Sequence, residues 1–148
     1  MTGFFIPCIP PKSTHQASLR IMKKKDGTQF IGKFASSKGK AVQDELLILL
    51  REFAPPSPYS VALRVSVEWI YPWRKAETKK NIAKGYMPCT TRPDCDNLFK
   101  MVGDCMTRLG YWTDDSLIAD LRFKKGYGNN SGVGVVIEEI GESAQNEP

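Results

Sequence analysis

Four aspartates lie at the two ends of one short stretch of this 148-residue chain, and together they could hold a divalent metal ion. Asp94 and Asp96 are separated by one residue, and Asp114 and Asp115 are adjacent. Carboxylates that lie close together repel each other, which raises their pKa values unless a cation neutralises them. Mg²⁺ is suited to this role because it prefers oxygen ligands and binds one or two carboxylates together with substrate phosphate oxygens.

Such a site suits the hydrolysis of a phosphodiester. The metal would orient and activate water, polarise the phosphoryl group and stabilise the leaving oxygen. At helical spacing Lys100 falls on the same side as Asp96 and Asp104, where its charge could stabilise the transition state. Phosphatases and nucleotide-sugar transferases share a bare Asp-x-Asp motif, so the acids alone do not select a substrate.

A simpler interpretation of the first pair is helix capping. An aspartate at the N-cap stabilises a helix by about 1 kcal/mol and is favoured by the positive end of the helix dipole. Either Asp94 or Asp96 could fill this role, but one cap needs one carboxylate. Capping therefore leaves the other aspartates unexplained, and both interpretations stay open.

The net charge of +5 indicates a polyanionic partner such as nucleic acid. The densest basic segment, residues 72–93, contains Arg74, Lys75, Lys79, Lys80, Lys84 and Arg92. Lysine clusters are also common on ordinary solvated surfaces, so the charge favours nucleic acid only weakly. Trp73 and Tyr86 lie in the same segment and could stack on an unpaired base, whereas Trp69 and Trp112 are expected in the core.

Periodicity predicts the elements that must position these residues. Apolar residues at helical spacing predict helices over about 37–53 and 98–109, the second with Leu98, Met101, Val102, Cys105 and Leu109 on one face. Strict alternation from Val61 to Trp69 predicts a strand over 60–71 with one buried face. Gly110 is expected to end the second helix, and the segment 111–121 to be extended.

Other segments are predicted from turn residues. Residues 3–11 suit an edge strand because of their prolines, and Asp26–Gly27 predicts a hairpin over 19–34. Two more strands are expected around 116–125 and 132–140, joined by a polar turn. Residues 72–93 show no sustained period and predict a long, basic, mobile loop, and residues 142–148 a frayed tail.

Length and composition limit the classes of protein to which this chain can belong. A chain of 148 residues with 41% hydrophobic residues predicts a single domain with a real core. We expect a cytoplasmic protein, since no apolar run approaches the roughly 18 residues of a membrane span and no signal peptide is visible. The four cysteines show no metal-ligand spacing and are expected to be reduced, and the single histidine, His15, nearly excludes histidine-based triads.

The run "DCDNLFKMVGDCMTRLGYWTDDSLIADLRFKK" resembles the core motif of the RusA family of Holliday junction resolvases. The shared pattern is DxDNLxK, a helix that ends in glycine and an aromatic residue, DD, and a strand that ends in lysine. Weaker similarity in "IPCIPPKSTH" and "FASSKGKAVQDEL" extends the resemblance over most of the chain. Where the family typically carries asparagine after its Pro-Pro turn, this chain has Lys12, Ser13 and Thr14, and its 72–93 segment is longer than in compact members.

The resemblance implies a role for each matching residue. Asp94, Asp96 and Asp115 would be the catalytic metal ligands and Lys100 the catalytic cation, with Asp114 a further possible ligand. Lys125 would lie near DNA or the site, and we expect DNA contacts from Arg92, Arg74, Lys75, Lys79 and Lys80. The implied cofactor is Mg²⁺, with Mn²⁺ as a substitute and no nucleotide cofactor.

The family resemblance also implies an α+β domain with two main helices on a small mixed or antiparallel sheet, and a homodimer. Two subunits related by a two-fold axis would nick opposed strands of a four-way DNA junction during recombination and repair. Two alternatives stay open from the residues: a metal nuclease for forks, flaps or other branched DNA, and a non-catalytic junction-binding module. No membrane partner is expected.

Overall fold

The computed structural model describes residues 1–14, 18–34 and 37–141, without the side chains of residues 18–22, 30–34, 37 and 38. The expectations for His15 and for the tail at 142–148 lie outside the described residues. No helix in the described ranges is long and apolar enough to cross a membrane.

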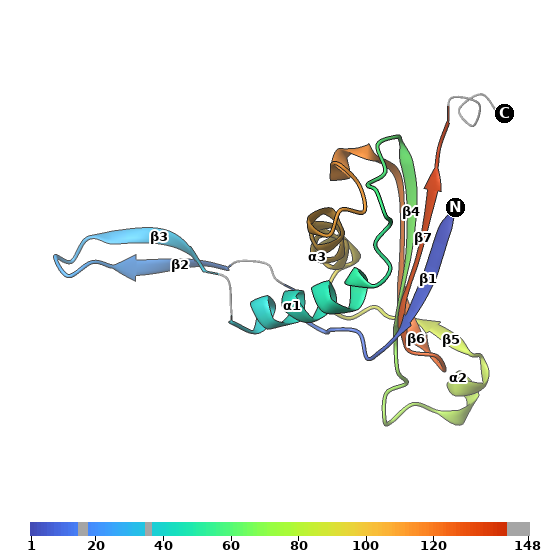
Figure 1. Cartoon of the computed structure of the whole chain (residues 1–148). Helices are drawn as coiled ribbons and strands as arrows, with labels where there is room; N and C mark the ends of the chain where they lie inside the picture. Colours follow the sequence, from blue (N-terminus) through green and yellow to red (C-terminus); the bar gives the residue numbers. More distant parts are fainter. Residues whose placement is uncertain (15–17, 35–36, 142–148) are drawn as a thin grey trace.

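A mixed five-stranded sheet in the order β1-β7-β4-β6-β5 forms the body of the molecule (Figure 1). Its strands are β1 (Thr2–Pro7), β4 (Leu63–Tyr71), β5 (Tyr86–Pro88), β6 (Ile118–Gly128) and β7 (Gly132–Glu139). β4 and β6 are parallel, and the other neighbouring pairs in this sheet are antiparallel. The edge position predicted for the first strand is confirmed. β6 and β7 follow each other in the chain, yet β4 lies between them.

Two main helices, α1 (Ser37–Arg51) and α3 (Cys95–Arg108), cover one face of this sheet (Figure 1). This confirms the predicted α+β class with two helices packed on a mixed sheet. α1 ends at Arg51, two residues before the predicted end, because the amides of Phe53 and Ala54 bond three residues back, to Leu50 and Arg51 at 3.2 and 3.3 Å, and so leave the α-helical pattern. Phe53 leaves the helix and stacks on Phe4 of β1, with ring centroids 4.6 Å apart.

The core lies between α3, α1 and the covered face of the sheet. The alternation predicted for β4 is confirmed, since Leu63, Val65, Val67 and Trp69 are buried. The predicted apolar face of α3 is confirmed for Leu98, Met101, Val102 and Cys105, and Leu109 packs partly buried against it. Trp112 is also buried, as expected. The prediction for Val61 was wrong: β4 begins at Leu63, and Val61 is 44% exposed.

The chain turns sharply where α3 ends. Gly110 has a φ of 81°, which confirms the predicted helix end because glycine adopts positive φ at little cost. The following segment was expected to be extended, but Asp115–Leu117 forms the short 3₁₀ helix η1 before β6 begins. The Asp114 side chain accepts a hydrogen bond from the Ser116 amide at 2.8 Å and so starts this turn.

The predicted hairpin is confirmed as β2 (Ser18–Lys23) and β3 (Gln29–Phe34), which pair antiparallel around Gly27 at a φ of 89°. The hairpin projects away from the sheet, beyond the start of α1 (Figure 1).

Residues 72–93, predicted as a long, basic, mobile loop, do not form a loop throughout. The segment contains helix α2 (Lys79–Ala83) and strand β5, which pairs antiparallel with the end of β6. Thr78 caps α2 by accepting a hydrogen bond from the Asn81 amide at 3.2 Å. Both elements are too short to produce a visible period, and β5 depends on pairing with a distant strand.

The packing of α3 on the sheet predicts a clear stability difference between two leucines. Leu98→Ala should lower the free energy of unfolding by about 2–5 kcal/mol, because Leu98 is fully buried and its removal leaves a cavity. Leu121→Ala, at a 44% exposed position of β6, should cost about 1 kcal/mol or less. Urea unfolding of the two variants measures the difference, and equal losses would contradict this account of the core.

Candidate active site at the start of helix α3

Asp94 occupies the N-cap position of α3 but does not use its side chain as a cap. Its backbone is extended, with φ −71° and ψ 152°, and its carbonyl accepts the first helical hydrogen bond from the Leu98 amide at 3.0 Å. Its carboxylate makes no capping hydrogen bond and is exposed. Capping therefore does not account for this carboxylate, which is open to a ligand.

Asp96 and Lys100 follow on the exposed side of α3. Asp96 lies in the first turn and Lys100 one turn later, at the i,i+4 spacing that places both side chains on the same side of the helix. The helix thus presents two carboxylates and one ammonium group near its start, as the sequence predicted.

A hollow of about 320 Å³ lies beside Asp94, and we call it the Asp94 hollow. Its walls include Lys12, Ser13, Thr14, Arg92, Asp94 and Asn97. Sequence reasoning left the role of the turn at Lys12–Thr14 open, and it did not single out Asn97 within the DxDNLxK motif. The structure places both next to the first acidic residue, so that two cations and several polar groups surround one free carboxylate.

Lys125 lies at this site and points toward the protein backbone. Its Nζ donates hydrogen bonds to the carbonyl oxygens of Thr91 and Pro93, the second at 2.7 Å. These bonds tie the end of β6 to the segment that leads into α3. Lys125 therefore acts as a positioning residue for Asp94.

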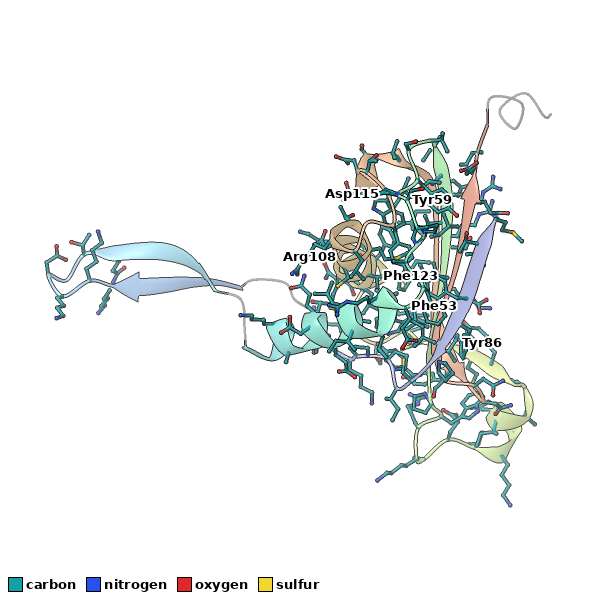
Figure 2. All side chains as sticks on the ribbon, viewed as in Figure 1. Phe53, Tyr59, Tyr86, Arg108, Asp115 and Phe123 are labelled. Atoms are coloured by element: carbon teal, nitrogen blue, oxygen red, sulfur yellow. The ribbon has the colours of Figure 1, made fainter. Side chains whose placement is uncertain are left out.

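Asp114 and Asp115 lie at the other end of α3. In Figure 2 Asp115 lies toward the end of the sheet opposite Tyr86, and η1, which Asp115 begins, contacts α3. Asp114 is engaged in the cap of η1, and the hydrogen bond from the Ser116 amide lowers the pKa of its carboxyl group. Asp115 is exposed.

One chain does not bring the two acidic pairs together. α3 has 14 residues and is therefore about 21 Å long. β6 runs back along it, since Phe123 contacts Phe99 and Lys125 reaches Pro93. Over the described ranges, no group of three or more acidic, histidine or cysteine side chains is placed to hold a metal ion. The assignment of Asp115 as a metal ligand stays a prediction.

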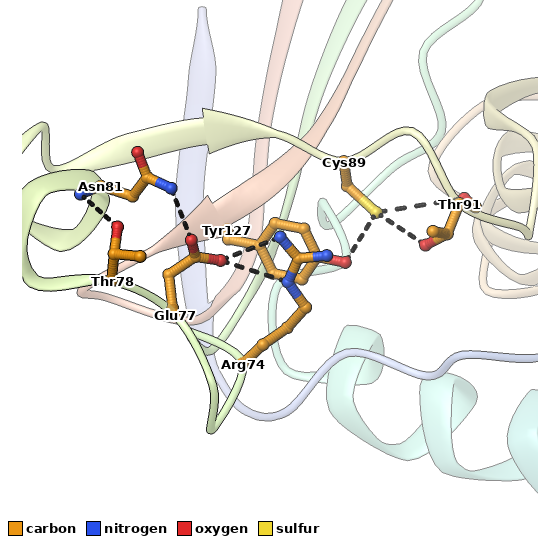
Figure 3. A network of polar contacts seen from close by, with 7 residues as sticks. All are labelled: Arg74, Glu77, Thr78, Asn81, Cys89, Thr91 and Tyr127. Carbon is orange, nitrogen blue, oxygen red and sulfur yellow. Dashed lines mark hydrogen bonds and ion pairs between the residues drawn. The ribbon is translucent and has the colours of Figure 1, made fainter.

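Arg74, one of the predicted basic residues, is held by a ring contact and by hydrogen bonds. Its guanidinium carbon lies 4.8 Å from the centre of the Tyr127 ring, and its Nη2 and Nε bond to Glu77 at 2.9 and 3.2 Å (Figure 3). Asn81 donates to the other Glu77 oxygen at 2.7 Å. The hydrogen bonds from Asn81 and Arg74 lower the pKa of Glu77, which keeps the pair charged. Sequence reasoning missed Glu77 and Asn81, whose only local signal is their i,i+3 and i,i+4 spacing.

Four more of the predicted basic residues are exposed. Lys75, Lys79, Lys80 and Arg92 surround the same end of the sheet as Asp94. The two aromatic residues of this segment are anchored to the protein. Trp73 donates from Nε1 to Asn129 at 2.7 Å, and the Tyr86 hydroxyl donates to the Lys125 carbonyl at 3.2 Å.

The role of Lys125 can be tested by hydrogen exchange. Lys125→Met removes two charge-assisted hydrogen bonds, each worth about 1.5–3 kcal/mol, and should reduce the protection of amides 98–102 by about tenfold or more. Lys124→Met, at an exposed neighbouring position, should leave these amides unchanged. Equal exchange in both variants would show that Lys125 does not hold the start of α3.

Comparisons with known proteins agree with the geometry. The model of the family described as "Endodeoxyribonuclease RusA" matches residues 9–138. An uncharacterized protein, YqaN, of Bacillus subtilis is 28% identical over 109 residues, which are 70% of this chain and 76% of that protein.

Two relatives carry the name crossover junction endodeoxyribonuclease RusA. The protein of Lactococcus phage r1t is 33% identical over 55% of this chain and 57% of its own length. The protein of Escherichia coli O139:H28 is 45% identical over 27% of this chain and 33% of its own length. Because the family model spans most of the residues, including all four aspartates and Lys100, this chain belongs to the RusA family of endodeoxyribonucleases.

Proposed function

We propose that this nuclease resolves four-way DNA junctions by paired, Mg²⁺-dependent nicks in opposed strands. The observation that carries the proposal is the free carboxylate of Asp94. Asp94 is the N-cap residue of α3, but its side chain makes no capping hydrogen bond and lines a hollow whose walls also include Lys12 and Arg92. The names of the two relatives support the choice of substrate. We propose the cytoplasm as its compartment, because relatives of this chain come from bacteria, whose DNA lies in the cytoplasm.

The donor set at the start of α3 suits a hard cation. Asp94 and Asp96 offer carboxylate oxygens, and the hollow adds hydroxyl and amide groups from Ser13, Thr14 and Asn97. Mg²⁺ commonly binds to one or two carboxylates plus phosphate oxygens, and Mn²⁺ accepts the same ligands. When bound, such an ion would activate water and stabilise the leaving oxygen.

The other residues of the site would bind and orient the phosphodiester. Lys12 and Arg92 supply positive charge in the walls of the Asp94 hollow, where they would offset the charge of the DNA backbone. Lys100, one turn into α3, would stabilise negative charge on the transition state. Lys125 would keep the start of the helix in place.

The exposed cations would extend this binding surface along the backbone of the DNA. Lys75, Lys79 and Lys80 are exposed and lie in the segment that precedes the site. Binding through such phosphate contacts is strongly salt-dependent and independent of sequence, so the choice among junctions, forks and flaps would depend on the shape of the DNA.

The distance between the acidic pairs supports a metal site that two subunits share. Asp94 and Asp115 lie at opposite ends of α3 within one chain. In a symmetric homodimer a surface of one subunit meets the partner, so that Asp115 of the partner subunit can approach Asp94 and Asp96. Two such sites would be related by the two-fold axis, as paired nicks in a four-way junction require.

The first test is the removal of one carboxylate. Asp94→Asn should abolish the cleavage of a synthetic four-way junction in Mg²⁺ and leave binding without metal within about threefold, since the change removes a ligand charge but little volume. The control Asp44→Asn changes an exposed aspartate of α1. Fixed and mobile junctions, forks and linear duplex are compared in one gel assay. Full cleavage by Asp94→Asn would overturn the metal-ligand assignment, and equal rates on linear duplex would overturn the structure selectivity.

The second test mixes two inactive variants. Asp94→Asn and Asp115→Asn should each be inactive, but after subunit exchange the mixed dimer should recover one intact site. The expected result is nicking of a single strand at about a quarter of the wild-type rate, because about half of the dimers are mixed and each has one site. Nicking assays on a junction labelled on each strand measure this. If the mixture stays inactive while mixed dimers form, each metal site belongs to one subunit.

A further inference from the structure

A second hollow, of about 250 Å³, lies next to the Asp94 hollow, and we call it the aromatic pocket. Its walls include Tyr71, Trp73, Arg74 and Tyr127, and it shares Lys12 and Arg92 with the Asp94 hollow. Tyr71 ends β4 and Tyr127 lies near the end of β6, so the pocket opens at the carboxyl ends of two parallel strands. Ligands commonly bind at this end of parallel strands in open α/β sheets.

Arg74 presents a fixed flat surface to this pocket. One face of its guanidinium lies on the Tyr127 ring, and its Nε and Nη2 donate hydrogen bonds to Glu77, whose side chain is only 5% exposed (Figure 3). The Arg74 side chain is nevertheless 54% exposed, so much of it is accessible to a ligand. A guanidinium plane is a stacking surface for nucleobases, as aromatic rings are.

Trp73 supplies an aromatic ring to the same pocket. It is half-buried and anchored through Nε1 to Asn129, whereas the other two tryptophans, Trp69 and Trp112, are buried in the core. Tyr71 completes the wall, with its hydroxyl donating to the Pro11 carbonyl at 3.1 Å. Trp73 and Arg74 are thus held in place before any ligand binds, which lowers the entropic cost of binding.

We propose that the aromatic pocket binds one unstacked nucleobase, from the nucleotide next to the scissile phosphate. The base would stack on Arg74 and Trp73, and Lys12 and Arg92 would contact the backbone between the two hollows. The pocket is smaller than the roughly 300–1,000 Å³ of sites for drug-sized ligands, so it suits one base and excludes a base pair. This inference rests on the proposed function.

Such a pocket would favour branched DNA over linear duplex. A base inside a duplex must be unpaired and unstacked before it can enter, whereas a nucleotide at a crossover has already lost part of its stacking. The pocket would therefore add affinity at the branch point. The exposed lysines of α2 would bind both kinds of DNA.

The experiment pairs a protein change with the removal of a base. Trp73→Ala and Arg74→Lys are measured for binding to a four-way junction without divalent metal, and an abasic site is moved through the nucleotides around the crossover. Arg74→Lys keeps the charge and loses the plane. On the intact junction each variant should bind about 5-fold to 100-fold more weakly than the wild type. When the abasic site replaces the nucleotide whose base enters the pocket, the variants and the wild type should bind equally, because the base that Trp73 and Arg74 would contact is missing. If the variants lose the same affinity relative to the wild type wherever the abasic site lies, the pocket proposal is overturned. Unchanged binding of the intact junction by Arg74→Lys would also overturn it.

Two controls separate the pocket from general charge and from the nuclease activity. Lys79→Ala removes an exposed cation of α2 and should weaken all junctions equally, abasic or intact. A short single-stranded oligonucleotide should quench tryptophan fluorescence in the wild type and not in Trp73→Phe, since Trp69 and Trp112 are buried. Quenching without cleavage of any junction would support the pocket and overturn the proposed function. Normal junction cleavage with no Trp73-dependent quenching would overturn the pocket alone.

Discussion

The parallel pairing of β4 with β6 is the constraint on which the rest of the structure depends. Two adjacent parallel strands need a connection that carries the chain back to the end of the sheet where the first strand began. Here α3 makes this return across the face that α1 also covers. Its buried side, from Leu98 to Met106, closes the core against the sheet, so the hydrophobic effect fixes the path of the crossover.

The same constraint determines where the chemical groups lie. The segment between β4 and α3 must lie at the carboxyl ends of the two parallel strands, and it carries six of the 21 lysines and arginines together with Asp94. The segment that follows α3 must lie at the opposite end, and it carries Asp114 and Asp115. Within a single chain, the two acidic pairs therefore lie about one helix length apart, although they belong to one sequence motif.

Different forces hold the two halves of the proposed binding surface. The start of α3 is held by burial of Leu98 and by the Lys125 hydrogen bonds from β6, so its position depends on the core. Arg74 depends on Tyr127 and on its hydrogen bonds with Glu77, which Asn81 in turn holds by a hydrogen bond of its own. The position of the carboxylates is thus coupled to global stability, whereas the position of Arg74 rests largely on contacts within residues 74–81 and one contact to β6.

The sequence by itself determined the elements with strong local signals. Burial along a single element is visible in the period-two alternation of β4 and in the apolar face of α3. Backbone conformation is visible in the glycine at 110 and in the Asp-Gly turn. The sequence also located the carboxylates and the lysine of the motif, because side-chain types and their spacing are covalent properties of the chain.

Only the tertiary structure decided which elements are neighbours. β4 lies between β6 and β7, β5 pairs with β6 although it has three residues, and Lys125 donates to a segment more than thirty residues away. A local pattern shows which face of an element is buried but not which partner covers it, since long-range pairing depends on the free energy of the whole core. For the same reason the free carboxylate of Asp94, its distance from Asp115 and the aromatic pocket became visible only in three dimensions.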